Sequence, residues 1–149
     1  MRLRTIRLRA LRDAPDAFGS TAEEVAARPP ESWAEQLSTL PTFVAVIEGR
    51  DVGLVRFDPD EESAETGWLI SMWVSPEARG AGVRGALIDA LVESATSLGV
   101  AQLELDVGDY NAPAIALYSS QGVEATGETS RLDPPREHIL EHRLVLKLR

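Results

Sequence analysis

Hydrophobic and polar positions change their period sharply in the middle of the chain. Residues 68–74 are bulky, apolar and uncharged, which predicts a strand buried on both faces. Pro76 follows, and proline cannot continue a central strand. Over residues 83–98 the apolar side chains return at helical spacing, and Gly99 ends that pattern. The centre of the chain is therefore predicted to be a strand, a glycine-rich loop and a helix.

The N-terminal part of the chain carries weaker patterns. The side chains of residues 2–9 show a weak period-two alternation. This pattern predicts a short first strand near a sheet edge, where charged side chains are tolerated. A short helix is predicted over residues 10–17 and another over residues 31–40. Between them, Thr21 and Glu24 have the spacing of a capping box, which predicts one more helical turn.

Two further strands are predicted before the central unit and one after it. Residues 43–48 and 51–57 are joined by a Gly49 turn, which is typical of a β-hairpin. Residues 101–107 alternate between apolar and acidic side chains, which predicts a strand. Because a helix connects it to residues 68–74, the two strands are expected to pair in parallel through a right-handed crossover.

The residue pattern in the C-terminal part of the chain predicts one helix and two strands. Asn111 can cap a helix whose first turn tolerates Pro113, and Gly122 stops it. Residues 123–126 predict a short strand, and residues 138–148 a half-exposed final strand, expected to be antiparallel.

The loop between the central strand and helix has a physical use. Its glycines, Gly80, Gly82 and Gly85, let the backbone approach a ligand closely. The first N–H groups of the following helix have no internal partner, so they can bind a pyrophosphate. Arg79 adds a positive charge at the edge of this site. A tight turn without a ligand is the alternative, and the short glycine pattern alone does not decide between them.

A dinucleotide-binding site is a second alternative. The three glycines have the spacing of that fingerprint, and Asp106 lies about twenty residues beyond them, where an acid would bind the ribose. However, several residues separate the strand from Gly80, where the fingerprint places glycine almost at once.

Arg84 also leaves two interpretations open. It lies over the apolar stripe in the first helical turn, where it either contacts a bound anion or extends to water.

Composition narrows the function. The 149 residues and the 44% hydrophobic content suit one folded domain, expected to span residues 1–149. A net charge of −9 disfavours nucleic acid and anionic membranes as partners. The absence of cysteine excludes disulfides and thiolate sites and fits a cytoplasmic location. No apolar run is long enough to span a bilayer, and the acids and histidines have no metal-ligand spacing.

Two motifs together resemble a known family. Residues 74–83, with Val74, Pro76, Arg79, Gly80 and Gly82, resemble the acetyl-CoA-binding motif of GNAT N-acetyltransferases. Residues 111–123 are similar to the second motif of that family, which carries an asparagine, an alanine, a tyrosine and a glycine in this order. The two motifs in sequence, joined by a helix and a strand, are far more specific than either alone.

The resemblance implies an α/β fold. It has a mixed sheet of six or seven strands, helices on both faces, and a central parallel pair of strands that splay apart around the cofactor. The implied reaction transfers an acetyl group from acetyl-CoA, the cosubstrate, to a primary amine of a small molecule or peptide. Tyr118 is expected to protonate the leaving thiolate, since its unperturbed pKa of about 10 is close to that of a thiol. A homodimer is an expectation at the level of the family alone.

The resemblance also assigns the cofactor site. Backbone groups of Met72 and Val74 are expected to bind the pantetheine and the acyl carbonyl. The full set expected to bind the cofactor is Met72, Trp73, Val74, Arg79, Gly80, Ala81, Gly82, Val83, Arg84, Gly85, Asn111, Ala114 and Tyr118.

Three positions depart from the family pattern. Arg84 occupies the place of the last small residue, Val123 replaces an aromatic side chain, and Trp68 stands where many members carry a glutamate that serves as general base. Candidate replacements for the base are Glu104, Asp106, Asp109, His138 and His142. A water chain, or no base at all, is as consistent with the sequence. An acyl-CoA-binding module with little or no catalytic activity is therefore the alternative to an enzyme.

Overall fold

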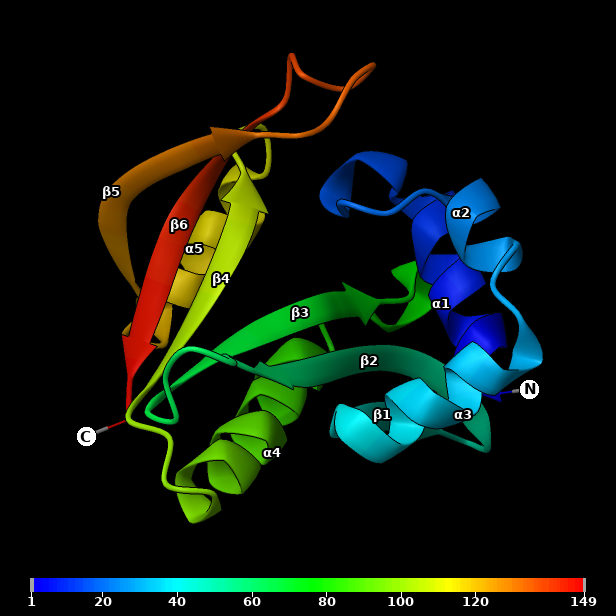
Figure 1. Cartoon of the computed structure of the whole chain (residues 1–149), viewed down its shortest axis with the longest axis horizontal. Helices are drawn as coiled ribbons and strands as arrows, with labels where there is room; N and C mark the ends of the chain where they lie inside the picture. The colour runs from blue at the N-terminus through cyan, green and yellow to red at the C-terminus, as the bar shows by residue number, and fades with distance from the viewer. Residues whose placement is uncertain (1, 149) are drawn as a thin grey trace.

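A computed structural model describes residues 2–148 of the chain (Figure 1). The helical elements, in chain order, are α1 (Arg2–Asp13), η1 (Pro15–Ala17), α2 (Ala22–Ala26), α3 (Pro30–Thr39), η2 (Pro76–Ala78), α4 (Val83–Ser97) and α5 (Ala112–Ser120). The strands are β1 (Thr42–Ile47), β2 (Arg50–Pro59), β3 (Thr66–Val74), β4 (Gln102–Gly108), β5 (Glu124–Arg131) and β6 (Leu140–Lys147).

The strands form one mixed sheet in the order β1-β2-β3-β4-β6-β5. Only β3 and β4 pair in parallel, and the other neighbours within the described residues are antiparallel. The predicted strand–helix–strand crossover and the antiparallel final strand are both confirmed. β5 continues to Arg131, beyond the predicted residues 123–126, because it pairs along β6 up to Leu140.

Helices cover both faces of the sheet, as expected. On one face, α4 and α5 pack on the strands through a core that contains Leu91, Leu103 and Tyr118. On the other face, α1, α2 and α3 pack around Trp33 and the inward side chains of the strands. In Figure 1 these three helices lie together at the β1–β2–β3 end, away from β5 and β6. The segment after α1 is therefore placed close to the C-terminal end of β3.

The predicted first strand is wrong, because residues 2–9 belong to helix α1. Its buried side chains include Leu3, Ile6 and Ala10, which recur at helical spacing. Arg7 lies on the same buried side, so a charge interrupts the apolar face and the helical period is hard to recognise in the sequence. The predicted helix over residues 10–17 is instead the end of α1 followed by the 3-10 turn η1.

The capping box at α2 is confirmed. Glu24 N donates to Thr21 Oγ1 at 3.2 Å, and Thr21 N donates to Glu24 Oε2 at 3.1 Å. We expect Thr21→Ala to lower the free energy of unfolding by about 1 kcal/mol, because it leaves the Glu24 N–H without its cap. Urea denaturation measures the change, and Thr21→Ser should restore most of it. An equal loss in both variants would show that the cap does not contribute.

The central parallel strands splay apart. β3 pairs with β4 only from Thr66 to Trp68, although both strands continue well beyond this short region. At the branch point Gly67 lies under the ring of Phe57, and a Cβ at Gly67 would collide with that ring. From there on, the edge of β3 that faces β4 has no strand partner within residues 2–148. This unpaired edge, which Figure 1 shows between β3 and β4, positions the candidate site.

Candidate active site

A cavity of about 870 Å³ occupies the gap between the splayed strands. Its walls are the ends of β3 and β4, the glycine loop with the start of α4, the start of α5, and the segment that follows α1. It brings together these residues of the sequence prediction: Met72, Trp73, Val74, Arg79, Gly80, Gly82, Val83, Arg84, Gly85, Asn111, Ala114 and Tyr118. Ala81 is the single member of the predicted set outside the lining.

The glycine loop presents free backbone donors to this cavity. Gly82 caps α4 in the left-handed region at φ 78°, and Gly80 has φ 85°, conformations that favour glycine. The first hydrogen bond of the helix runs from Ala86 N to Gly82 O at 3.1 Å. The N–H groups of Val83, Arg84 and Gly85 precede that bond, so they have no helical acceptor. Together with the helix dipole they form a site suited to a phosphate.

Gly85 has no such conformational requirement. Its φ is not positive, and a Cβ there would only approach Gln121 Nε2 at 3.4 Å. The turn therefore needs glycine at Gly80 and Gly82 but not at Gly85. This arrangement explains how the loop forms although Arg84 replaces the usual small residue.

Arg79 holds the loop against the N-terminal segment. Its guanidinium donates to Asp13 Oδ2 at 2.6 Å and to the carbonyl of Val74 at 3.1 Å. The indole of Trp73 donates to the same carboxylate at 2.9 Å. Arg79 therefore links the end of β3 to the end of α1, and Asp13 offsets part of the positive charge that the sequence predicted for the edge of the site.

A bulge redirects the end of β3. The β2–β3 register shifts between Leu54 and Arg56, and opposite this shift Ser71 has φ 59°. Further along, Ser75 N donates to Val52 O of β2 at 2.7 Å. Because backbone groups alternate in direction along a strand, the N–H and C=O groups of Val74 and Met72 turn toward β4 and the cavity. The bulge thus directs backbone groups into the gap, and of these the Val74 carbonyl already accepts from Arg79.

Tyr118 closes the cavity from α5. The residue is 4% exposed, and burial raises the pKa of its phenol, while the nearby Arg84 guanidinium opposes that shift. The phenol is therefore protonated at neutral pH and can donate a proton. Asn111 orients this helix, since its side chain accepts from Ala114 N at 3.3 Å.

Of the candidate bases, only Asp106 lines the cavity. Its carboxylate accepts from Arg143 Nε at 2.6 Å, so an ion pair occupies it. Asp109 contacts His142 at 2.7 Å, and neither of these two residues lines the cavity. Glu104 and His138 also lie outside the lining. Trp68, in the place of the family glutamate, lines the cavity and lies under the Arg143 guanidinium, 4.4 Å from the ring centroid.

The structure adds a carboxylate that the sequence did not single out. Glu141 of β6 lines the cavity opposite Gly108 of β4, half-buried and without an ion pair within the described residues. Burial and the charge of Asp106 raise the pKa of Glu141 above the usual glutamate range. In the sequence it is one of several polar positions on a half-exposed strand, and only the pairing of β6 with β4 brings it to the site.

Two negative findings complete the description of residues 2–148. No group of three or more histidine, aspartate or glutamate side chains is placed to hold a metal ion in this part of the chain. Nor does it contain a helix that is both long and apolar enough to cross a membrane.

Comparison with known proteins gives a consistent family assignment. The acetyltransferase (GNAT) family model matches residues 7–123. An L-2,4-diaminobutyric acid acetyltransferase of Nocardia farcinica is 35% identical over 79 residues, which cover 53% of this chain and 41% of the relative. The chain spans only 41% and 38% of the length of two curated relatives that it matches.

Solved structures share the fold over most of the chain. A ribosomal-protein-alanine N-acetyltransferase of Brucella melitensis superposes with a TM-score of 0.77 and 25% identity, covering 97% of this chain and 93% of the other. A Salmonella typhimurium structure that contains its cofactor acetyl-CoA gives a TM-score of 0.66 at 22% identity, covering 87% and 75% of the two chains.

Proposed function

The chain belongs to the GNAT family of acetyltransferases, and we propose that it transfers an acetyl group from acetyl-CoA to a primary amine. The observation that carries this proposal is the cavity between the splayed strands. At one side it has the free N–H groups of the glycine loop, and along its length it has the unpaired edge of β3. Tyr118 and Glu141 also line it, and they contribute a proton donor and a carboxylate.

The residues present fit acetyl-CoA. The N-terminal turn of α4 offers backbone donors for the pyrophosphate, and a side chain at Gly80 or Gly82 would be strained there. The edge of β3 at Met72 and Val74 offers donors and acceptors to the amide groups of the pantetheine arm, as an added strand would use them. The Val74 carbonyl already accepts from Arg79, so we assign the larger share to Met72.

The chemistry then needs three groups of this chain. Bound acetyl-CoA supplies an acetyl thioester. Glu141 takes a proton from the acceptor ammonium, so that the neutral amine can attack the thioester carbonyl carbon. The Met72 N–H donates to the carbonyl oxygen as negative charge develops on it. A nitrogen–carbon bond would form as the carbon–sulfur bond breaks. Tyr118 would give its proton to the leaving sulfur, and the proton that the new amide nitrogen loses would restore the phenol.

The relatives indicate two kinds of acceptor. One is a free amino acid, as the name of the Nocardia farcinica relative states, and the other is the alanine of a ribosomal protein, as for the Brucella melitensis structure. We propose a small amine, because the segment after α1 and Tyr110 also line the cavity and leave limited room for a protein chain.

Thermal unfolding with CoA, acetyl-CoA and NAD tests the cofactor. At about a hundredfold excess over the dissociation constant, a ligand that binds the folded state should add about 2.7 kcal/mol of stability. We expect both CoA species to raise Tm and NAD to leave it unchanged. A shift with NAD alone would favour the dinucleotide alternative. A shift with CoA but no turnover on a broad amine panel would favour a binding module without catalysis.

Arg84 provides a second test of the cofactor site. Its side chain is half-buried at the cavity and lies near Tyr118. If it also binds a phosphate, Arg84→Ala should weaken CoA binding by about 1.5–3 kcal/mol, the range for a hydrogen bond to a charged group. Isothermal titration measures this. Unchanged CoA affinity together with reduced turnover would instead show that Arg84 acts on Tyr118 and not on a phosphate.

A further inference from the structure

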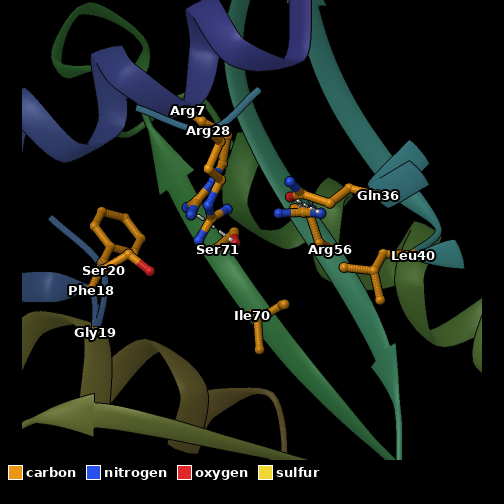
Figure 2. A pocket seen from close by; sticks show the side chains of 10 residues that line it. All are labelled: Arg7, Phe18, Gly19, Ser20, Arg28, Gln36, Leu40, Arg56, Ile70 and Ser71. Carbon is orange, nitrogen blue, oxygen red and sulfur yellow. Dashed lines mark hydrogen bonds between the residues drawn. The ribbon is translucent and has the colours of Figure 1, made fainter. Parts of the chain in front are cut away.

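A second cavity, of about 520 Å³, contains three arginines and no acidic side chain (Figure 2). Arg7 comes from α1, Arg28 follows α2, and Arg56 comes from β2. In Figure 2 the side chains of Arg7 and Arg28 reach toward Ser71, and Arg56 meets Gln36 beside the same hollow. The remaining lining residues are Phe18, Gly19, Ser20, Leu40 and Ile70.

Two of these arginines are buried with unused donors. Arg7 is 5% exposed and Arg56 is 2% exposed. Arg7 Nη1 donates to Ser71 Oγ at 3.3 Å, and Arg56 Nη2 donates to Gln36 Oε1 at 2.9 Å. The Nε atoms of both side chains have no hydrogen-bond partner within the described residues. Buried guanidinium donors are normally satisfied, so both side chains lack acceptors for part of their hydrogen-bonding capacity.

The charge of the cluster is also uncompensated. No aspartate or glutamate within residues 2–148 forms an ion pair with Arg7, Arg28 or Arg56, although the chain as a whole carries a net charge of −9. Asp58 acts on Arg56 only through its charge at longer range. Burial and the charges of Arg56 and Arg28 lower the pKa of Arg7 to about 10, so it stays protonated at neutral pH. Such burial is costly unless an anion completes the site.

The arginine cavity adjoins the candidate active site. Both cavities are lined by Phe18, Gly19, Ile70 and Ser71. Ser71, which Arg7 contacts, directly precedes Met72 in the bulge of β3. The two cavities can therefore hold one molecule, with its anionic group on the arginines and its other end at the reacting end of the active-site cavity. Glu141, whose carboxylate lines that cavity, attracts an ammonium group.

We propose that the acceptor amine also carries a carboxylate or a phosphonate-type oxyanion, which Arg7, Arg28 and Arg56 bind. This inference rests on the proposed function, because it names the substrate class of the same site. The planar guanidinium fork matches either oxyanion in bidentate geometry, so the chemistry of recognition is shared between the two. The acceptor is thus a zwitterion, with its amine toward the end of β3 and its anion between α1 and β2.

Matched acceptors test the proposal. Initial rates are measured for alanine against alaninamide, β-alanine against its amide, and 2-aminoethylphosphonate against its diethyl ester, each with saturating acetyl-CoA. We expect kcat/KM to be at least about tenfold higher for the charged member of a productive pair. The pair with the largest ratio distinguishes the carboxylate from the phosphonate. Equal use of the charged and neutral members of every pair would overturn the proposal.

Variants connect the preference to the cluster. Arg56→Gln should lower kcat/KM for the charged acceptor about ten- to hundredfold and leave the neutral one nearly unchanged. Arg28→Gln, at a half-buried position, should give a smaller loss of the same kind. Arg12→Gln, on the exposed side of α1, removes one arginine outside the cavity and should change neither. Equal losses for charged and neutral acceptors in Arg56→Gln would show that Arg56 supports the fold and does not bind the acceptor.

A binding measurement separates this inference from the proposed function. With saturating CoA present to fill the phosphate site, succinate and inorganic phosphate at constant ionic strength should raise Tm of the wild type. The doubly substituted Arg28→Gln, Arg56→Gln protein should lose that shift. If no amine is acetylated but the anion shift persists, the proposed function fails and the anion site stands. If acetylation occurs without anion preference or anion shift, the function stands and this inference fails.

Discussion

Tyr118→Phe is expected to lower kcat about a hundredfold or more while acetyl-CoA still binds, the effect typical of removing a general acid. The phenol is buried beside Arg84, and its raised pKa keeps the proton in place at neutral pH. Phenylalanine keeps the ring that packs in the core between α5 and the sheet. The loss should therefore fall on proton transfer to the leaving sulfur and not on the fold.

The measurement is steady-state kinetics with the thermal shift as its control. Tm should remain close to the wild-type value, and the CoA-induced shift should be preserved. An acyl donor whose thiol has a lower pKa leaves without help, so Tyr118→Phe should recover part of its rate with such a donor. A uniform loss with every donor, accompanied by a lower Tm, would show that Tyr118 is structural.

Glu141→Gln is expected to lower kcat/KM about a hundredfold and to remove the acid limb of its pH profile. A base must be deprotonated, so activity is lost as the pH falls through the pKa of Glu141. Burial and Asp106 raise that pKa, which places the limb above the usual glutamate range. Glutamine has a similar shape but cannot accept a proton. An acceptor amine of high pKa stays an ammonium throughout the measured range, so its own titration adds no second limb.

Asp106→Asn independently tests the direction in which the acid limb of the pH profile should move. Removing the Asp106 charge lowers the pKa of Glu141, because one repulsive charge is lost and Arg143 is released from its ion pair. The acid limb should then move to lower pH. Glu93→Gln, on the exposed side of α4, changes the same chemical group outside the cavity and should leave the profile unchanged. A wild-type limb that persists in Glu141→Gln would assign the base to another group.

The two catalytic predictions and the arginine cluster describe one charge pattern. Glu141 gives the active-site cavity a carboxylate without an ion pair among the described residues, and Arg7, Arg28 and Arg56 make the adjoining cavity basic. A simple amine would satisfy only the first of these. The acceptor preference and the pH profile therefore test neighbouring parts of the same site with different measurements.

The sequence by itself determined the features that depend on local chemistry. The break from an apolar strand to Gly80, Gly82 and an amphipathic helix places a left-handed turn and free N–H groups at a fixed point of the chain. The caps at Thr21 and Asn111 were also predictable, because each involves a side chain and a backbone group three residues apart. Tyr118 was found through its place in the second motif.

Only the tertiary structure decided the features that join distant segments. The segment 2–9 alternates in sequence yet forms a helix, because its buried side is shared by Leu3, Ile6 and Arg7. Glu141 reaches the cavity through the pairing of β6 with β4. Arg56 of β2 and Arg7 line one cavity because α1 packs on that face of the sheet. Charge and burial at such positions depend on what packs against them, and no periodic pattern along the chain encodes that.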